Sequence, residues 1–583
     1  MMKASPRSIG ALCALALLLS ASGCRRHRKT TSAPNTTDYS DNLQPLVASK
    51  ELAFLRWPNV SDYQPLVQTF YEDRNYEIAW TRDGKPTPAT LGFIQAFKEA
   101  GAKGLNSEDY DASRWDARVQ MLSPKEEDAV AQFDVAMTVC VMRFISDLRI
   151  GRVNPQHFHF DIDVANKKYD LAEFVSDNAV DVTDVPTLLQ KVQPDSELYR
   201  RTEQALARYI DLSKQQKQQD APPLSEIKAP ISAGQPYAEA PFLLQRLQLE
   251  GDLDATSPDQ PSPKLFTKEL SEGVKAYQHR HGITEDGKLT PQTVASLNVP
   301  LSDRVKQLQN TLERWRWLPD PYVNPRLMVN LPEFVLRGYT PDHQLDFTMK
   351  VVVGKVVGEH QTPVFAHMMK YIIFRPYWNV PVDIARKELV PHIEANRSYL
   401  ETKNFETVNS KGQPVPYTAK LVSQGGVMVR EKPGPKNSLG LVKFMFPNQY
   451  DVYLHSTPAT ELFNRTRRDF SHGCVRVQEP EQLAAWLLKD QKDAQNKDGG
   501  DWTLEDVHEA MANGPDNHQV NLKTPIPIVI FYMTAYVEDD GHIHFFDDIY
   551  GYDADLQKVL AKGPPYPIKP DPAAPKPKEG DKV

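Results

Sequence analysis

The chain has 583 residues, of which 40% are hydrophobic and 25% charged, and a formal net charge of -8. A single hydrophobic core rarely exceeds about 250–300 residues, so this length predicts several domains. The composition is that of a folded globular protein, and the negative net charge argues against nucleic acid as a partner. Four cysteines are too few for a disulfide framework: Cys13, Cys24, Cys140 and Cys474.

The amino-terminal segment has the features of an export signal. In residues 1–24, Lys3 and Arg7 precede an apolar run that is too short to span a bilayer as a mature helix. The run leads into Ala-Ser-Gly-Cys, which resembles a bacterial lipobox and predicts lipidation of Cys24; cleavage without lipidation is the alternative. Residues 25–54, basic and then rich in Ser, Thr and Asn, predict a flexible tether. We therefore expect a periplasmic lipoprotein that contacts the membrane through its amino-terminal lipid anchor only.

Two helical regions follow. Residues 55–237 show apolar residues at three- and four-residue spacing, which predicts a helical domain. Residues 238–300 contain three shorter amphipathic stretches separated by glycine-containing turns, which predict a small three-helix unit. The helical periodicity of the first region is clearest over residues 65–71, 90–100, 127–148 and 198–215.

Residues 301–562 begin with a predicted helix and then change to short β-type runs. Their spacing predicts a compact β-sandwich or barrel-like domain, interrupted at about 382–432 by a predicted helix and polar loops. Residues 563–583, dense in Pro and Lys, predict a disordered tail. The expected fold class is therefore multidomain α+β. The β-type runs are residues 326–330, 347–353, 368–373, 420–422, 442–446 and 449–455.

One cysteine lies in a setting that favours chemistry. Cys474 occurs in SHGCVRV, with His472 two residues and His455 nineteen residues before it. A thiol reacts as its thiolate, so it needs a nearby base or positive field, which the two histidines and Arg476 offer. Gly473 suits a loop whose N–H groups stabilise an oxyanion. The alternatives are a buried structural cysteine and a zinc site, for which no fourth ligand is evident.

These residues resemble a known family. YLHST followed by SHGCVRV resembles the signature of the L,D-transpeptidases, in which a histidine precedes a Ser/Thr-x-Gly-Cys-x-Arg/Asn motif by a similar spacing. The blocks VNLPEF, VVVGKVVGEHQTPVF, PYWNVP and PGPKNSLGLVKFMFPN occur in the order of the large periplasmic members. The resemblance implies a helical scaffold domain at 55–237, a three-helix peptidoglycan-binding module at 238–300 and a mainly β L,D-transpeptidase catalytic domain at 301–562. It also implies that residues 382–432 form a capping insertion over the active site.

The resemblance further implies a two-step acyl transfer. Cys474 would attack the carbonyl of the third stem-peptide residue and expel the terminal D-alanine, leaving a thioester that an amine of a neighbouring stem resolves. His455 would be the base, with His472 as the competing candidate and otherwise a hydrogen-bonding neighbour. The N–H groups of Gly473 and Cys474 would bind the oxyanion. No cofactor and no metal is implied.

Other site residues are assigned supporting roles. Ser471 and Arg476 would shape the loop, and Arg476 could instead meet a substrate carboxylate. Tyr453, Trp378 and Asn379 would line the cleft, with packing in the core as the alternative reading of the aromatic residues. The expected partners are peptidoglycan stem peptides and glycan.

Three other functions remain open at this point. If water resolves the thioester, the same residues make an L,D-carboxypeptidase, and if a protein amine does so, they anchor a protein to the wall. An inert Cys474 would leave a non-catalytic wall-binding lipoprotein, which a carbapenem would fail to acylate. A papain-like protease is disfavoured because its cysteine opens a helix, whereas Cys474 lies among β-type residues.

Overall fold

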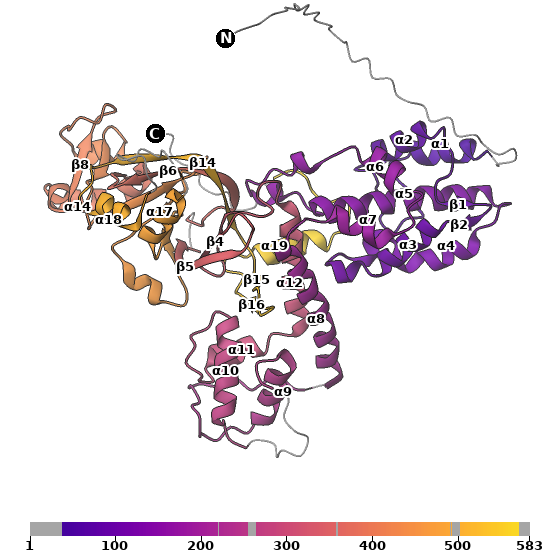
Figure 1. The fold of residues 1–583 in the computed structure, drawn as a ribbon, viewed down its shortest axis with the longest axis horizontal. Coiled ribbons are helices and arrows are strands. Elements are labelled where there is room, and N and C mark those ends of the chain that lie inside the picture. The colour runs from indigo at the N-terminus through magenta and orange to yellow at the C-terminus, as the bar shows by residue number, and fades with distance from the viewer. Residues whose placement is uncertain are drawn as a thin grey trace, which may run out of the picture.

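The computed structural model describes residues 38–219, 221–254, 264–356, 360–489, 491 and 502–570. The predicted signal sequence and Cys24 therefore lie outside the described residues. Figure 1 shows a helical body at one end, a β-sheet body at the other and a small helical unit below them. The three meet around the paired helices α8 (Glu197–Gln219) and α12 (Leu301–Trp317).

The amino-terminal body is built around α5 (Glu127–Ile150), which is buried on almost every side. Its length and apolar composition would suit a membrane span, but 83% of its most apolar window is buried within the protein, as in a core helix. Cys140, predicted to be a buried helix residue, lies on α5 with no exposed surface, and burial raises its pKa. Around α5 lie α1 (Ser40–Ala48), α2 (Gln64–Asp73), α3 (Pro88–Lys98), α4 (Trp115–Met121), α6 (Leu171–Asn178), α7 (Val185–Val192) and the hairpin β1 (Thr81–Arg82) and β2 (Lys85–Pro86).

The prediction of a flexible tether over residues 25–54 is wrong for residues 40–48. Helix α1 occupies part of it and buries Leu43 and Val47 in the core of the helical body. The two residues are four apart and so face the same side of the helix. Their burial outweighs the polar composition of the surrounding sequence.

The small helical unit has its own core and contains the three predicted helices. They are α9 (Ala240–Glu250), α10 (Lys268–Arg280) and α11 (Pro291–Leu297). Leu243, Leu247, Val274 and Tyr277 are buried between them. Gly251 ends α9 in a left-handed conformation (φ +87°), which favours glycine.

The carboxy-terminal body contains a nine-stranded sheet in the order β12-β5-β13-β11-β10-β6-β14-β3-β4. An additional pairing between β4 and β5 closes this sheet, which confirms the predicted barrel-like domain. The strands are β3 (Leu327–Asn330), β4 (Val335–Tyr339), β5 (Leu345–Gly354), β6 (Phe365–Phe374), β10 (Val442–Met445), β11 (Leu454–His455), β12 (Asp469–Ser471), β13 (Val475–Val477) and β14 (His518–Phe531). Helices α17 (Pro480–Leu488), α18 (Leu504–Ala512) and α19 (Tyr552–Leu560) and the hairpin β15 (Ala535–Val537) and β16 (Ile543–Phe545) complete it.

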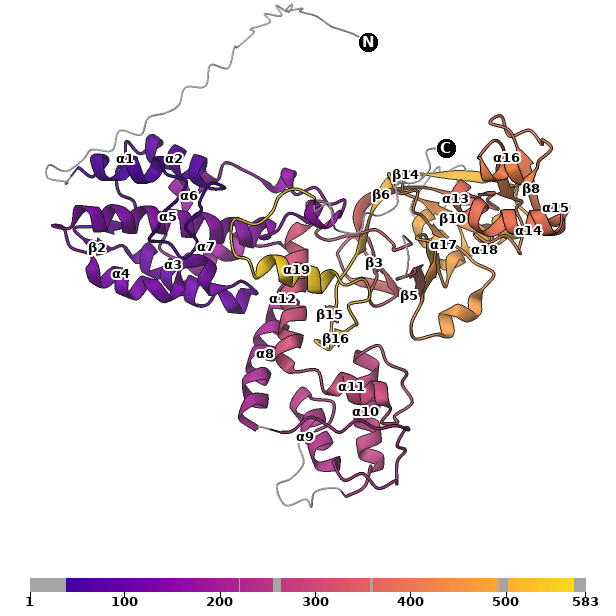
Figure 2. The ribbon, with the colours of Figure 1, turned by 180° about the vertical axis from the view of Figure 1, so that it is seen from behind.

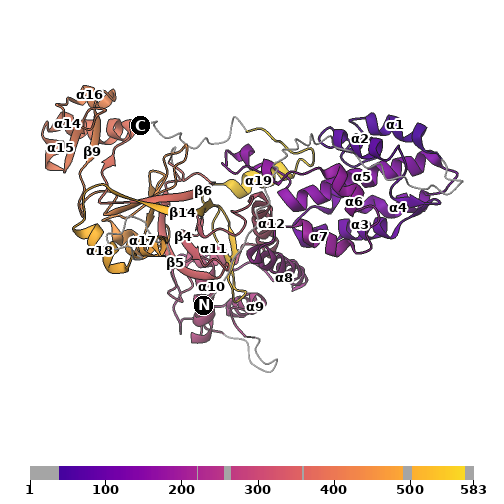
Figure 3. The ribbon, with the colours of Figure 1, turned by 45° about the horizontal axis from the view of Figure 1, so that its top comes forward.

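A separate subdomain, which we call the cap, is inserted between β6 and β10. Figure 3 shows it at the end of the sheet body farthest from the amino-terminal helices. Its three-stranded sheet has the order β7-β9-β8, and its own apolar core includes Leu389, Leu400 and Val429. Its elements are β7 (Trp378–Asn379), α13 (Val382–Ile384), a π-helical turn at Ala385–Leu389, α14 (Val390–Ala395), α15 (Tyr399–Thr402), β8 (Phe405–Val408), α16 (Ala419–Ser423) and β9 (Met428–Glu431).

Two local predictions are wrong. Residues 420–422 form part of helix α16 instead of a strand, because Thr418 caps the helix by accepting a hydrogen bond from the Leu421 N–H. The tail predicted to be disordered is ordered over its described part, where the Tyr566 hydroxyl donates to Asp109 at 2.7 Å. A side chain at Gly563 would collide with the ring of Trp57, so the chain packs closely against the helical body there.

Candidate active site

The parallel pairing of β11 with β13 brings the predicted site residues together. Leu454 pairs with Val475 and His455 with Arg476, and the Val475 N–H donates to the Tyr453 carbonyl at 3.1 Å. Alternate residues of a strand share a face. Tyr453 and His455 on one strand therefore lie on the same side of the sheet as Cys474 and Arg476 on the other.

Cys474 is half-buried, and its thiol donates to the Asp451 carbonyl at 3.7 Å. Burial raises the pKa of the thiol to about 11, although hydrogen bonding by Tyr453 and the positive charge of Lys443 act in the opposite direction. The sequence predicts a positive field that deprotonates the thiol near neutral pH. In the free protein desolvation outweighs that field, so Cys474 rests as a thiol.

His455 is buried with 4% of its surface exposed. Burial and, after it, the charge of Arg476 lower its pKa to about 3. The ring is thus neutral, and its Nδ1–H donates to the Ser456 carbonyl at 2.5 Å. That bond places the ring proton on Nδ1 and leaves Nε2 unprotonated, which is the form a general base needs, and the Leu439 carbonyl also acts on the ring.

Lys443 is a site residue that the sequence analysis missed. It pairs with His455 across β10 and β11, and its ammonium lies 5.5 Å from the centre of the Tyr453 ring. Burial lowers the pKa of Lys443, and the neighbouring Cys474 opposes that change. A single lysine in the apolar run LVKFMF was the available signal, since a charge in a buried strand usually has a partner.

Arg476 completes a row of three residues across the sheet, Lys443, His455 and Arg476. Burial lowers the pKa of its guanidinium, and Cys474 and Glu461 act against this change. Its Nε is buried and has no hydrogen-bond acceptor among the described residues. A donor in this state suits a substrate carboxylate, the second of the two predicted roles of Arg476.

The loop before Cys474 is held by Gly473 at φ +123°. The Gly473 carbonyl accepts from the Thr362 hydroxyl at 2.7 Å, and its N–H donates to the Ser471 hydroxyl at 3.2 Å. The predicted oxyanion donation by the Gly473 N–H is therefore not available in this geometry, because Ser471 occupies it. For the Cys474 N–H, the structure gives no acceptor among the described residues.

His472 points toward the cap. Its Nε2–H donates to Glu388 of the π-helical turn at 2.7 Å, and its ring lies edge-on to His360 with 4.9 Å between centroids. This contact favours the hydrogen-bonding role over that of the base. It also joins the loop that precedes Cys474 to the cap.

Trp378 and Asn379 belong to the cap sheet. They pair with Glu431 and Arg430 of β9, and the Trp378 ring packs toward Phe405 with 6.5 Å between centroids. The contacts of Trp378 are therefore those of a residue packed against the cap core, the alternative reading of its sequence. Among the described residues, no group of three His, Cys, Asp or Glu side chains is arranged to hold a metal ion.

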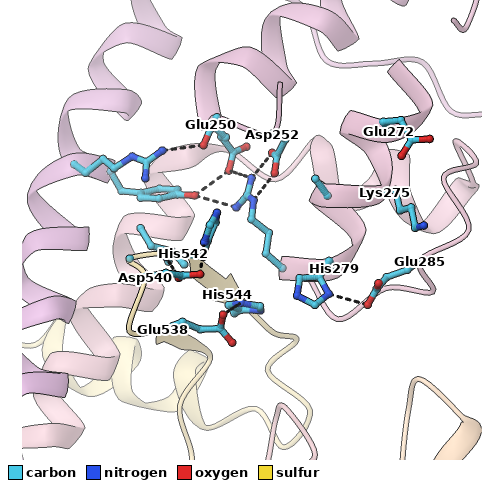
Figure 4. A pocket seen from close by; sticks show the side chains of 17 residues that line it. Glu250, Asp252, Glu272, Lys275, His279, Glu285, Glu538, Asp540, His542 and His544 are labelled. Atoms are coloured by element: carbon cyan, nitrogen blue, oxygen red, sulfur yellow. Dashed lines mark hydrogen bonds and ion pairs between the residues drawn. The ribbon is translucent and has the colours of Figure 1, made fainter. Parts of the chain in front are cut away.

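A cavity of about 590 Å³ lies at the joint between the three-helix unit and the sheet body (Figure 4). Its wall includes a buried charged network: Arg280 donates to Asp252 at 2.6 Å, to Glu250 at 3.0 Å and to the Tyr209 hydroxyl of α8 at 3.1 Å. Arg280 is itself buried, so this network ties α10 to the end of α9 and to α8.

We expect Arg280→Met to loosen this joint. The change leaves the buried Asp252 without its ion-pair partner and leaves Glu250 with Arg246 as its remaining one, a loss of about 3–5 kcal/mol for a broken buried ion pair. Hydrogen exchange of amides in α9 and α10 should quicken accordingly. Lys275→Met is the control, since Lys275 is exposed on the same helix and lines the same cavity. Equal protection in both variants would show that the network does not hold the unit in place.

Three segments of the chain match family models. Residues 65–206 match the model described as "Scaffold domain", residues 243–297 the "Putative peptidoglycan binding domain" and residues 324–528 the "L,D-transpeptidase catalytic domain". The last segment contains Cys474 and His455.

Two individual proteins are also similar. A Haemophilus influenzae protein named "Putative L,D-transpeptidase" is 29% identical over 280 residues, which are 46% of this chain and 54% of that protein. The chain thus spans about half the length of this relative. A solved L,D-transpeptidase structure from Xylanimonas cellulosilytica covers 53% of this chain and 100% of its own at 14% identity, with a TM-score of 0.14, too low to support an argument.

Proposed function

The chain carries the catalytic domain of the L,D-transpeptidase family together with a scaffold domain and a peptidoglycan-binding-type domain, and we propose that it cross-links peptidoglycan through Cys474. The observation that supports this proposal most is the β11–β13 pairing, which sets a neutral imidazole and a thiol on one face of the sheet beside Lys443.

The first half-reaction forms a thioester. As the sulfur of Cys474 attacks the carbonyl carbon of the third stem residue, Nε2 of His455 accepts the thiol proton. The Cys474 N–H donates to the oxyanion. When the tetrahedral intermediate collapses, the bond to the terminal D-alanine breaks, and His455 returns the proton to the leaving amine.

The second half-reaction forms the cross-link. An amine of a neighbouring stem attacks the thioester carbonyl, and His455 takes a proton from that amine. The carbon–sulfur bond then breaks, and the departing sulfur is reprotonated as the thiol. The new amide joins two third-position residues. In both half-reactions the positive charge of Lys443 stabilises negative charge on the sulfur of Cys474.

Muropeptide mass spectrometry tests the proposal. Purified protein incubated with disaccharide tetrapeptides should yield dimers with the mass of two monomers less one D-alanine. Tripeptide monomers alone would indicate the carboxypeptidase, and acylation of an added protein would indicate wall anchoring. No product of any kind would favour the non-catalytic lipoprotein.

The state of the resting thiol gives a pH dependence. The thiolate is the reactive form, and its fraction grows as pH approaches the raised pKa of about 11. We expect the rate of Cys474 alkylation by iodoacetamide, followed on its tryptic peptide, to keep rising above pH 9. Lys443→Met should move the midpoint higher, since it removes a charge that favours the thiolate. A plateau below pH 7 would instead indicate a preformed thiolate.

The cellular location also remains a proposal. We infer from the export signal and the Ala-Ser-Gly-Cys sequence that the protein is a periplasmic lipoprotein anchored through Cys24. The mass of the mature amino-terminal peptide would decide between a lipidated and an unmodified residue.

A further inference from the structure

A second cavity, of about 320 Å³, lies far from the cysteine in the fold. One wall is the carboxy-terminal end of α5 and the segment that leads to α6, and the other is the chain at residues 564–568. Figure 2 shows this last segment, beyond α19, running back beside the amino-terminal helices. Neither the transpeptidase reaction nor the family matches assign this cavity a role.

The lining carries more positive than negative charge. Two of the cations are balanced: Arg143 lies 3.8 Å from Asp62, and Arg152 lies 3.1 Å from Glu313. The other acid of the lining, Asp147, has a pKa raised by burial to about 8 and is therefore mostly uncharged at pH 7. The acids thus leave no surplus negative charge.

Three further cations of the lining form no ion pair with any described carboxylate. Arg149 donates to the Lys167 carbonyl at 3.0 Å. Lys167 donates to the carbonyls of Arg316 at 2.6 Å and Leu318 at 2.9 Å, and Lys168 is exposed beside it. Carbonyl oxygens satisfy their hydrogen bonds but carry no full charge that would balance Arg149 and Lys168. Burial lowers the pKa of Lys167 to about 7 although Asp320 acts in the opposite direction, so Lys167 is partly charged at pH 7.

The hydroxyl of Tyr169 is a second group of this cavity that a ligand could satisfy. It is buried and has no hydrogen-bond partner among the described residues, an arrangement that costs free energy in a ligand-free protein. Its ring lies under the Arg149 guanidinium, 4.3 Å from ring centre to Cζ. A donor hydroxyl and two or three cations at one end of a cavity suit the several oxygens of a phosphate.

Beside polar residues such as Ser146 and Asn154, the rest of the lining includes several apolar side chains. Leu66, Ile150, Val164 and Leu171 contribute to it, and Ile568 lies at the edge with 72% of its surface exposed. Val164 and Leu171 also pack in the protein's own cores, whereas Ile568 is exposed and a free inorganic ion would leave it in contact with water. The ligand that fits both parts has an anionic head and an apolar body.

We propose that this cavity binds a small phosphate-bearing amphiphile, with the phosphate at Arg149, Lys167, Lys168 and Tyr169 and the apolar portion along Leu66 and Ile568. The same chemistry occurs in an anionic lipid and in a soluble phosphate ester. The proposed binding site is independent of the proposed cross-linking activity. A negative binding result would therefore not count against cross-linking.

Calorimetric titration of the full chain with dihexanoyl phosphatidylglycerol, below its micellar concentration, tests the proposal. Saturable binding that weakens with salt is expected. Inorganic phosphate should bind at least about tenfold more weakly because it lacks the apolar body. Equal affinity for inorganic phosphate would overturn the amphiphile assignment, and no binding of either probe would overturn the site.

Two variants separate binding from folding. Tyr169→Phe removes a hydroxyl that forms no bond in the free protein, so its melting temperature should stay the same or rise while lipid affinity falls about fivefold. Arg149→Gln should weaken binding about tenfold or more. Lys191→Gln, exposed on α7 and absent from the lining, is the matched control. A Tyr169→Phe protein that binds as tightly as the parent would refute the assignment of the hydroxyl to the phosphate.

Discussion

Cys474→Ala is expected to abolish formation of cross-linked dimers, because Cys474 is the one thiol that the described residues place on this face of the sheet beside His455 and Lys443. The substitution removes one sulfur from a half-buried position and adds no bulk. The fold should therefore persist, and the loss should lie entirely in turnover. The measurement is dimer yield from disaccharide tetrapeptides, with circular dichroism and the melting temperature recorded in parallel.

Cys140→Ala is the matched control for this experiment. Cys140 is the other free cysteine of the described chain, fully buried in α5, where burial raises its pKa and leaves it unreactive. This variant should lose some stability through the smaller side chain but keep its cross-linking activity. Dimer formation that survives in Cys474→Ala would contradict the mechanism directly.

His455→Ala should lower kcat by a factor on the order of 10² or more, the usual contribution of a general base. The neutral ring with Nδ1–H bound to the Ser456 carbonyl is already in the accepting tautomer. Removing it leaves water to take the thiol proton, while substrate contacts stay in place. We therefore expect KM to change little, and free imidazole to restore part of the rate.

His472→Ala provides the comparison that makes this prediction decisive. His472 is bound to Glu388 of the cap, so its loss should alter the attachment of the cap and raise KM more than it lowers kcat. If His472→Ala were the variant with the larger loss of kcat, the roles of the two histidines would have to be exchanged.

Much of the site was predictable because its residues lie in one short motif. The spacing between His455 and Cys474 allows two extended segments to run side by side, and the β11–β13 pairing is the result. The main helices were predictable because each buries an apolar face at helical spacing, as α5 does on nearly all sides. These features depend on local sequence.

The features that were missed depend on contacts between distant segments. Lys443 reaches the site only because β10 pairs with β11, and the Gly473 N–H is occupied because Ser471 turns back toward it. The high pKa of Cys474 follows from how deeply the completed fold buries the loop, a quantity that residue types alone do not give. In the same way, Tyr566 orders a proline-rich segment through a partner, Asp109, that lies 457 residues earlier.

The most direct test of the central claim is the mass of the enzyme during turnover. Protein mixed with a disaccharide tetrapeptide and quenched in acid should gain the mass of the donor less one D-alanine, and peptide mapping should place this thioester on Cys474. A donor-dependent product with no adduct on that residue, or an adduct on any other side chain, would contradict the account.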